Sequence, residues 1–403
     1  MIRTFARSIG ASRPVLALSM ARLGDAVGNS ILFIVIPLYV AKLPTRFDFP
    51  ESVRVGLLIS LYGLVTTACQ PLMGALSDRL GVRKPMIQGG LLLMAAATLS
   101  FMAARYYVDL VILRAMQGIA VAVTIPAALA LMAAITRKET RGGAMGVYST
   151  TRMVGFGIGP LIGGFAYEHL GFDATFIIGA AFILLGFLMV QIWVRDVPAA
   201  VTERASDRFR VFDRSLLTGG VLGAGFATFI MAGDFSMLAA LENQFNARLE
   251  QTAIGFSIAF SALMLSRLIF QIPLGRVSDR IGRRRLIVAG LLLLAPSTGL
   301  LGLAASTAQL TGLRLLQGLA SAGIAAPAFA LVADQSRAGG EGRQMSIVTT
   351  GFGLGIALGP LAAGVLAVVF FELPFLIAGI ITLIAALLVH RYVPETVQRE
   401  PRG

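Results

Sequence analysis

Long apolar segments alternate with short polar connections along the whole chain. A bilayer-spanning helix needs about 20 predominantly apolar residues, and each long segment meets that length. The first segment follows Arg3, Arg7 and Arg13, as in a secretory signal, but it is too long and lacks a small-residue cleavage pattern, so we predict a retained helix. The pattern predicts twelve spanning helices, at 14–41, 53–76, 85–104, 108–135, 142–167, 173–194, 215–240, 252–276, 286–305, 308–334, 342–369 and 373–393.

Composition agrees with a membrane protein. The chain is 56% hydrophobic and 14% charged, with a mean hydropathy of +0.81. Soluble domains average about 25% charged residues. The single cysteine, Cys69, excludes an intrachain disulfide, and two distant histidines, His169 and His390, make no metal set. We therefore predict neither a metal nor an organic cofactor.

Basic residues are distributed unevenly among the connections. Of the 34 Lys and Arg residues, 24 fall at the two termini and in alternate loops, and five fall in the opposite loops. The positive-inside rule then places both termini in the cytoplasm, and we predict a multi-pass protein of the cell (cytoplasmic or inner) membrane. The net charge of +13 is thus mainly a topology signal, and no loop is long enough to carry a nucleic-acid-binding module.

The chain contains two copies of one unit. The phrase at 74–85, Gly-Ala-Leu-Ser-Asp-Arg-Leu-Gly-Val-Arg-Lys-Pro, returns with changes at 275–286. Arg-x-x-Gln-Gly at 114–118 returns at 314–318, and the glycine pattern of 155–164 returns at 355–364. Duplicated halves are typical of membrane transporters. We predict an N-terminal six-helix bundle at 1–194, a cytoplasmic linker at 195–214 and a C-terminal six-helix bundle at 215–403.

These motifs resemble those of a known family. The duplicated Gly-x-x-x-Asp-Arg-x-Gly phrase resembles the signature of the major facilitator superfamily. The helix containing Gly155 and Pro160, and the Arg114-x-x-Gln117-Gly118 motif, resemble motifs of its proton-coupled drug antiporters. The resemblance implies an all-α membrane protein with twelve transmembrane helices in two pseudo-symmetric six-helix bundles. It also implies alternating access to a central site between the halves.

The duplicated phrase predicts a cytoplasmic gate. Gly74 would let two helix ends approach, Asp78 would accept from Arg side chains or lie at a helix amino terminus, and Gly81 would permit a tight turn. The alternative is that these charges serve topology alone. The predicted gate residues are Gly74, Asp78, Arg79, Gly81, Arg83, Gly275, Asp279, Arg280, Gly282 and Arg283.

Glycines four residues apart form one face of the helix at 142–167. Such a face permits close backbone contact with a neighbouring helix, and a proline there removes one amide donor and bends the segment. Tight packing alone and a role in gating both fit this pattern. The residues concerned, with their repeats, are Gly155, Gly159, Pro160, Gly163, Gly164, Gly355, Gly359 and Pro360.

Ionisable residues within apolar segments are the sharpest functional clues, since each costs at least about 2.5 kcal/mol on insertion scales. Asp25 lies near mid-depth of the first helix, with Arg22 and Asn29 on the same face. We predict that Asp25 carries the coupled proton and that Arg114 holds its carboxylate. The alternative is a static Arg22–Asp25 ion pair without proton traffic.

The other intramembrane charges are candidates for substrate binding. With the halves aligned by about 200 positions, Asp25 corresponds to Gly225, which places Asp234 several turns nearer the outside, where it would bind a cationic substrate, gate the outer mouth or cap a helix break around Gly233. Arg152 and Arg267 lie near mid-depth, and Arg267 has no Arg at its repeat position. The predicted substrate-binding residues are Arg22, Asn29, Arg152, Asp234 and Arg267.

Together these features favour a secondary active transporter, most simply one for proton-coupled efflux of amphiphilic drug-like compounds. Its partners would be a small-molecule substrate, protons and the lipid bilayer, with no nucleic acid, and we expect a monomer. The alternative is a carrier of an anionic metabolite, siderophore or lipid-like solute, because five intramembrane Arg outnumber two Asp. No paired nucleophile and base or metal motif supports an enzyme.

Overall fold

The computed structural model describes residues 12–45, 48–137, 140–195, 218–335 and 341–396, and within these ranges it contains helices and no strand. Eleven helices of the described residues are long and apolar enough to cross a membrane. One of them, α6 (Arg141–Trp193), comprises two of the predicted spans. At Gly171 its backbone has φ 85° and ψ −175°, which is not helical, so the chain kinks there between two helical segments. The twelve predicted spans therefore correspond to eleven helices.

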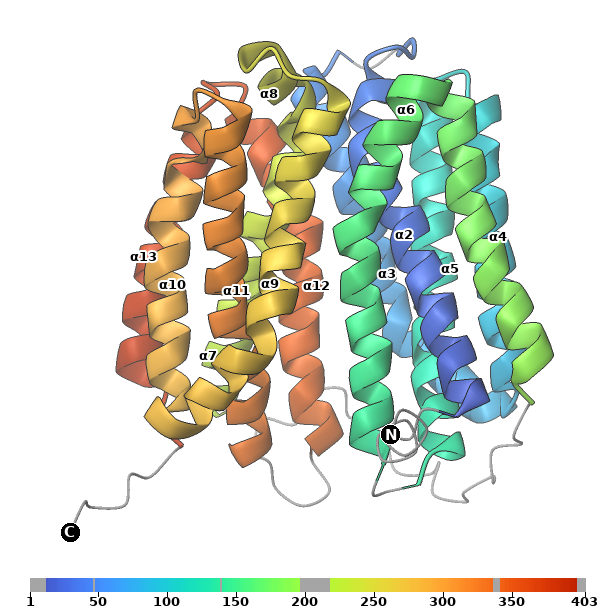
Figure 1. Ribbon diagram of the computed structural model, residues 1–403, viewed down its shortest axis with the longest axis vertical. Helices are drawn as coiled ribbons and strands as arrows, with labels where there is room; N and C mark the ends of the chain where they lie inside the picture. Colours follow the sequence, from blue (N-terminus) through green and yellow to red (C-terminus); the bar gives the residue numbers. More distant parts are fainter. Residues whose placement is uncertain (1–11, 46–47, 138–139, 196–217, 336–340, 397–403) are drawn as a thin grey trace. The chain divides into compact units, whose positions relative to one another are not determined.

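The described chain forms two compact units (Figure 1). The first consists of residues up to 48 and 61–208, and the second of residues 49–60 and 209–403. The helices of the first unit besides α6 are α2 (Arg13–Val40), most of α3 (Glu51–Leu80), α4 (Arg83–Ser100) and α5 (Tyr107–Ile135). Those of the second are α7 (Gly219–Ser236), α8 (Glu242–Arg248), α9 (Ala253–Ile281), α10 (Arg283–Gly299), α11 (Thr307–Gln335), α12 (Glu341–Leu366) and α13 (Leu373–Tyr392).

The first turns of α3 pack within the second unit. Ser52 Oγ donates to the Gly364 carbonyl at 2.8 Å, and the Leu361 amide donates to Ser60 Oγ at 3.0 Å. A Cβ on Gly56 would lie 2.5 Å from the Pro360 carbonyl oxygen. These contacts join the start of α3 closely to α12, and the same helix continues into the first unit.

Two helices extend beyond the predicted spans. Helix α3 continues to Leu80 and α9 continues to Ile281, so most of each duplicated phrase is helical rather than loop. In the second unit, a buried 3₁₀ turn, Met237–Leu241, connects α7 to α8. The predicted linker at 195–214 lies, apart from Arg195, outside the described residues.

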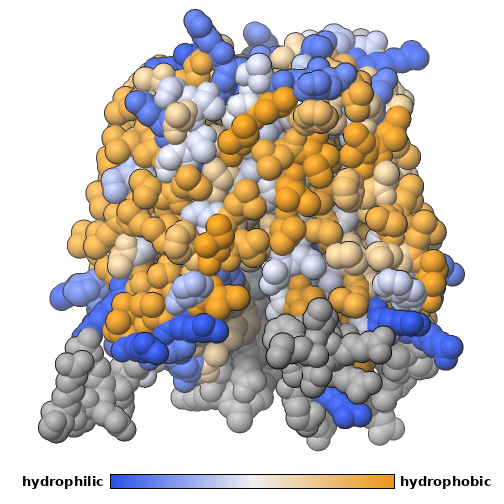
Figure 2. Space-filling view, viewed as in Figure 1, coloured by the Kyte–Doolittle hydropathy of each residue, from blue (hydrophilic) through white to orange (hydrophobic). Residues whose placement is uncertain are grey.

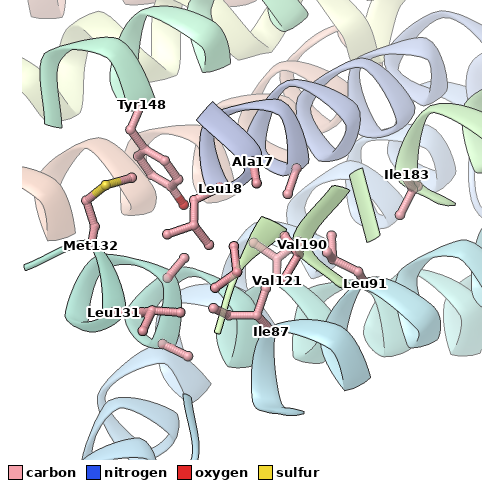
Figure 3. Packing of buried hydrophobic residues seen from close by; sticks show 14 of the residues in the cluster. Ala17, Leu18, Ile87, Leu91, Val121, Leu131, Met132, Tyr148, Ile183 and Val190 are labelled. Carbon is pink, nitrogen blue, oxygen red and sulfur yellow. The ribbon is translucent and has the colours of Figure 1, made fainter. Parts of the chain in front are cut away.

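The core of the first unit is formed where α2, α4, α5 and α6 meet (Figure 3). Leu18 and Ile87 are 1% and 0% exposed, and Tyr148 reaches from α6 toward Leu18. Helix α2 is apolar on nearly all sides and buried along most of its length, which is expected of a helix at the centre of a bundle. Its few polar side chains therefore lie in the interior.

The visible surface of each unit changes from apolar to polar along the helices. Apolar residues cover the middle of the helices, and hydrophilic residues gather toward both helix ends (Figure 2). Exposed large side chains of this apolar belt include Ile192, Ile269 and Leu387, each at least 65% exposed. A soluble protein does not expose so continuous an apolar surface, whereas a bilayer solvates it.

Candidate functional site

Helix α2 brings an acid and a base together in the first unit. Arg22 and Asp25 lie three residues apart, on one face of the helix. Arg22 Nη1 donates to Asp25 Oδ2 at 2.5 Å, and the two side chains are each 7% exposed. A charge-assisted bond of this length in a buried site is a strong interaction. The ion pair named as an alternative from the sequence is thus present, and its geometry alone does not decide whether it exchanges a proton.

Tyrosine and a small cavity border this ion pair. The Arg22 guanidinium carbon lies 5.9 Å from the centre of the Tyr148 ring. A cavity of about 10 Å³, lined in part by Arg22, Asp25, Thr124 and Tyr148, adjoins the pair. This volume matches one water molecule. The cavity therefore has room for a single water beside the carboxylate, whereas a drug-sized compound does not fit it.

Arg114 does not bond to Asp25 in the structure. Its Nη1 donates to Asn29 Oδ1 at 3.4 Å and to Gln117 Oε1 at 3.1 Å, and its guanidinium carbon lies 4.7 Å from the centre of the Tyr62 ring. Arg114 is fully buried on α5 and faces α2 one turn above Asp25. The second cation that acts electrostatically on Asp25 is Arg152 of α6. The geometry thus differs from the expected Arg114–carboxylate contact.

The second unit repeats the Arg114 arrangement. Arg314 Nη1 donates to Gln317 Oε1 at 2.9 Å and to the Phe235 carbonyl at 3.4 Å. Gln317 Nε2 then donates to Thr298 Oγ1 at 2.8 Å, as Gln117 Nε2 does to Thr98 Oγ1 at 3.0 Å. We call these two sets the Arg–Gln–Thr relays. Sequence reasoning recorded the Arg-x-x-Gln spacing but missed the threonines, whose only signal is their own repeat 200 positions apart.

Asp234 of α7 lies deep in the second unit. It is 5% exposed, and its Oδ2 accepts from Thr298 Oγ1 of α10 and Thr382 Oγ1 of α13, each at 3.0 Å. Helix α7 continues through Asp234 to Ser236, so the residue is not at a helix break. The structure therefore surrounds this acid with hydroxyl groups inside the helix bundle.

Arg152 and Arg267 are the partly exposed intramembrane cations. Arg152 lies 5.5 Å from the centre of the Phe156 ring on its own helix. Arg267 Nε donates to Gln271 Oε1 at 3.4 Å, and its guanidinium carbon lies 5.8 Å from the centre of the Phe352 ring of α12. Among the described residues, no carboxylate lies within salt-bridge distance of Arg267. A buried or half-buried arginine of this kind attracts an anionic group.

The duplicated phrase forms a charged cluster at the end of α9. Arg283 pairs with Asp279 and, at 3.3 Å, with Asp334 of α11. Its backbone amide donates to Glu395 Oε1 at 2.7 Å, which caps the start of α10. Gly282, with φ 114°, supplies the turn, as Gly81, with φ 64°, does in the first unit. The predicted turns at these glycines are present.

The first copy of the phrase differs from the expectation in one respect. Asp78 lies in the last turn of α3 rather than at a helix amino terminus, and its side chain is outside the described residues. Arg83 Nη1 donates to the Ala130 carbonyl of α5 at 3.3 Å.

The remaining gate residues of both copies lie on helices. Arg79 and Arg280 lie in the last turns of α3 and α9, where a cation is favourable. Gly74 and Gly275 lie within the same helices, close to α5 and α11.

The predicted glycine faces make close helix contacts in both units. In α6, Gly155 lies against Leu23 and Ala26 of α2, Gly159 against Val27 and Ser30, and Gly163 against Ile31. Gly164 and Pro160 are buried in the same helix. In α12, Gly355 and Gly359 lie against α7, and Pro360 against the start of α3. Close packing through glycine is thus present at both faces.

The described residues contain no group of three or more His, Cys, Asp or Glu side chains placed to hold a metal ion. The polar interior residues are instead single carboxylates, arginines, amides and hydroxyls.

Comparison with known proteins gives consistent results. The profile of the Major Facilitator Superfamily matches residues 18–238 and 224–403. The multi-drug resistance efflux pump PmrA of Streptococcus pneumoniae is 26% identical over 84% of this chain and 86% of its own. The multidrug resistance protein MdtG of Klebsiella pneumoniae is 28% identical over 87% of each chain.

Solved structures share the fold at lower identity. A bacterial homolog of the human lysosomal transporter Spinster, in an inward-facing and occupied conformation, has a TM-score of 0.78 at 16% identity and covers 93% of this chain and 95% of its own. The human organic anion transporter MFSD10 (TETRAN) has a TM-score of 0.65 at 19% identity, over 94% of this chain and 99% of its own. These similarities establish the architecture.

Proposed function

Because the chain belongs to the Major Facilitator Superfamily and is a multi-pass membrane transporter, we propose that it exports amphiphilic, drug-like compounds in exchange for protons. The observation that carries this proposal is the buried Arg22–Asp25 pair on α2. Efflux pumps among the curated relatives support the substrate class. We further propose alternating access, in which the substrate site opens to one side of the membrane at a time.

Proton exchange at Asp25 follows from the chemistry of a buried ion pair. Ionised Asp25 is stabilised by Arg22 and by the nearby charge of Arg152. A proton on the carboxylate removes that attraction and leaves Arg22 a free buried cation, which favours a rearrangement of α2 and its neighbours. A cationic substrate that approaches would compete with the proton for the same negative charge. Binding of one then favours release of the other.

We place the carrier in the cell (cytoplasmic or inner) membrane with both termini in the cytoplasm, on the distribution of basic residues. Its partners in this proposal are a small-molecule substrate, protons and lipid, and it works as a monomer without a resident cofactor. Asn29 and Arg114 would tune the site from one turn above Asp25, where they are bonded to each other.

Proton release from reconstituted vesicles tests the function. Purified protein would be placed in vesicles loaded with acid and a pH-sensitive dye. A panel would then be added to the outside: tetraphenylphosphonium as a cation, an uncharged lipophilic dye, and an arylsulfonate anion. We expect tetraphenylphosphonium and the neutral dye to accelerate proton efflux above the rate in protein-free vesicles. A response to the arylsulfonate alone would refute cation export.

Arg267 favours a second candidate, the transport of an anionic solute. Its guanidinium has Gln271 and the Phe352 ring as neighbours and, among the described residues, no carboxylate partner. A planar guanidinium beside an aromatic ring suits a carboxylate or sulfonate on an apolar body. Under this candidate Arg267 and Arg152 would anchor the substrate, whereas under the first they only shape specificity.

Arg267→Ala separates the two candidates. In an anion carrier we expect the variant to lose at least about tenfold of its transport rate, since one charge-assisted bond contributes roughly 1.5–3 kcal/mol. Arg267→Lys would restore part of that rate by returning the charge. In a cation exporter, Arg267→Ala would retain tetraphenylphosphonium transport and change only the relative rates across the panel. The native protein and the two variants are compared by their initial transport rates, measured in vesicles of equal protein content.

A further inference from the structure

The two Arg–Gln–Thr relays end differently. In the first unit the last hydroxyl, Thr98 Oγ1, donates to the Met94 carbonyl of its own helix at 2.8 Å. In the second unit the corresponding hydroxyl, Thr298 Oγ1, donates to Asp234 Oδ2 at 3.0 Å. The chain of hydrogen bonds therefore ends at a backbone carbonyl in the first unit and at a carboxylate in the second.

Packing contacts identify the position that corresponds to Asp234. Gly155 of α6 lies against Leu23 and Ala26, and Gly355 of α12 lies against Phe229 and Ala232. The first and seventh spans thus correspond at an offset of 206 positions (229 minus 23). Asp234 therefore corresponds to Gly28, and Asp25 corresponds to Met231. The earlier alignment of Asp25 with Gly225 is wrong by six residues, because the connections between spans differ in length.

The threonine opposite Asp234 has also replaced an apolar residue. Val190 of α6 and Val389 of α13 are buried, with exposures of 0% and 1%, and so are Val194 and Val393, which directly follow these helices, with exposures of 1% and 2%; both pairs are 199 positions apart (389 minus 190). Thr382 then corresponds to Ile183. In the first unit, Ile183 lies directly over Gly28, and a Cβ there would be 2.7 Å from Ile183 Cδ1. A Gly–Ile contact in one repeat is thus an Asp–Thr hydrogen bond in the other.

The hydrogen bonds of Asp234 leave one oxygen available. Both hydroxyls lie within donating distance of Oδ2, Thr382 Oγ1 sharing its hydrogen with the Ala378 carbonyl at 2.8 Å, and among the described residues no group donates to Oδ1. Nor does any described cation lie within 4.0 Å of the carboxylate. This differs from Asp25, whose carboxylate is bonded directly to Arg22. Neutral hydroxyl donors can serve an ionised and a protonated carboxyl alike, with the proton on Oδ1.

One charged group acts on Asp234 from the helices around it. Arg314 of α11 interacts with the carboxylate electrostatically, and its own hydrogen bonds go to Gln317 and the Phe235 carbonyl. Helices α10 and α13 present Thr298 and Thr382. Residues 344–366 of α12 contain no ionisable side chain, and neither does the turn 237–241. Asp234 therefore has a cation near it but none in contact.

We infer that Asp234 is a second proton-binding site, so that the carrier holds one exchangeable proton in each unit. The proton comes from bulk water and is carried on Oδ1, while the Thr298 and Thr382 hydroxyls keep their bonds to Oδ2. The relay from Arg314 keeps the ionised form stable without a direct ion pair. We propose this role in place of the predicted contact of Asp234 with substrate. The effect of Asp234 protonation on transport rests on the proposed function, whereas the protonation of Asp234 is independent of it.

Infrared difference spectroscopy tests the protonation directly. The full-length protein in lipid would be titrated from about pH 9 to about pH 4, a range that covers perturbed carboxyl groups, and the carboxylic-acid C=O absorption recorded. We expect one component of that absorption to disappear in Asp234→Asn and to persist in Asp25→Asn. In Thr382→Val the component should move in frequency, because one hydrogen bond to Oδ2 is lost, and Thr382→Ser should restore it.

Two results would overturn the inference. One is an Asp234→Asn spectrum that shows the same carboxylic-acid components as the native protein. The other, which applies if Asp234→Asn does not fold, is a native spectrum whose components are all unmoved by Thr382→Val. A merely structural, permanently ionised Asp234 gives these results, since a carboxylate has no such absorption.

The number of protons per substrate provides the transport readout. The ratio comes from the membrane potential at which tetraphenylphosphonium flux reverses under a fixed pH gradient. We expect the ratio to fall by half in Asp234→Asn. If the native protein shows no proton coupling, the proposed function fails while the infrared result still decides the protonation of Asp234. If coupling is present but both the ratio and the absorption are unchanged, only the second site fails.

Discussion

Substitution of Asp25 by Asn is expected to abolish accumulation of substrate driven by a pH gradient, while exchange of labelled substrate across the membrane continues. Asn has the shape of Asp and can accept the bond from Arg22, but it cannot take up a proton at neutral pH. Because the substrate competes with a proton only at Asp25, a proton at Asp234 alone does not drive transport, and the substrate then moves only down its own gradient. Accumulation under an imposed pH gradient and exchange at equilibrium, measured in the same vesicles with labelled tetraphenylphosphonium, separate the two activities.

Stability must be separated from coupling in this experiment. Removing one partner of a buried ion pair costs about 3–5 kcal/mol, because the other charge remains buried. The double variant Arg22→Gln, Asp25→Asn removes both charges, so we expect it to regain thermal stability without regaining driven accumulation. Asp109→Asn, at the start of α5, is the control acid and should accumulate substrate normally. Native-like accumulation by the single Asp25→Asn variant would show that the Arg22–Asp25 pair is static.

Gly355→Leu is expected to prevent stable assembly of α7 on α12. Even a Cβ at Gly355 would lie 2.2 Å from the Phe229 carbonyl oxygen and 2.8 Å from the Ala232 Cβ, so the helices must separate. Inserting extra atoms into a packed interior typically costs about 1–3 kcal/mol, and the backbone here cannot rotate aside. Gly355→Ala should lower the melting temperature of the detergent-solubilised protein by several degrees, and Gly355→Leu should reduce the yield of monodisperse protein.

Gly312 of α11 supplies the matched control. A Cβ at that position meets no atom within 4 Å, so Gly312→Ala should leave the melting temperature unchanged or raise it slightly through higher helix propensity. If Gly355→Ala melts like Gly312→Ala, the close approach of α7 and α12 does not contribute to stability. The same pair of substitutions also tests the glycine pattern first seen in the sequence.

The helical architecture was accessible from the sequence, because a bilayer leaves few alternatives for an apolar segment of some 20 residues. The spans, the duplication and the glycine faces all follow from local pattern. The Arg22–Asp25 pair was equally accessible, since three-residue spacing on a helix fixes its neighbours. The turn within α6 at Gly171 also falls between two predicted spans. Local periodicity, in short, was sufficient wherever the partners lie on one helix.

Contacts between helices were not accessible in the same way. The repeat offset is 206 for the helix containing Asp234 and 199 for the helix containing Thr382, whereas the duplicated phrase gives 201. An error of one residue turns a side chain by about 100° around the helix, so a single offset cannot place interior partners. The sequence also does not fix which turn of a neighbouring helix a side chain meets, and Arg114 was assigned to Asp25 although it bonds to Asn29, one turn further along.

The order of the chain and the boundaries of its compact units do not coincide. The first turns of α3 belong with α12, while the remainder of that helix belongs with α4, α5 and α6. A fragment that begins in the segment between the two repeats therefore lacks Ser52, Gly56 and Ser60, and it exposes the backbone around Pro360 and Gly364 that they cover. A gene split at that segment yields two products of which the second is incomplete as a folding unit. The carrier is thus a duplication in sequence but not a simple tandem of separable halves.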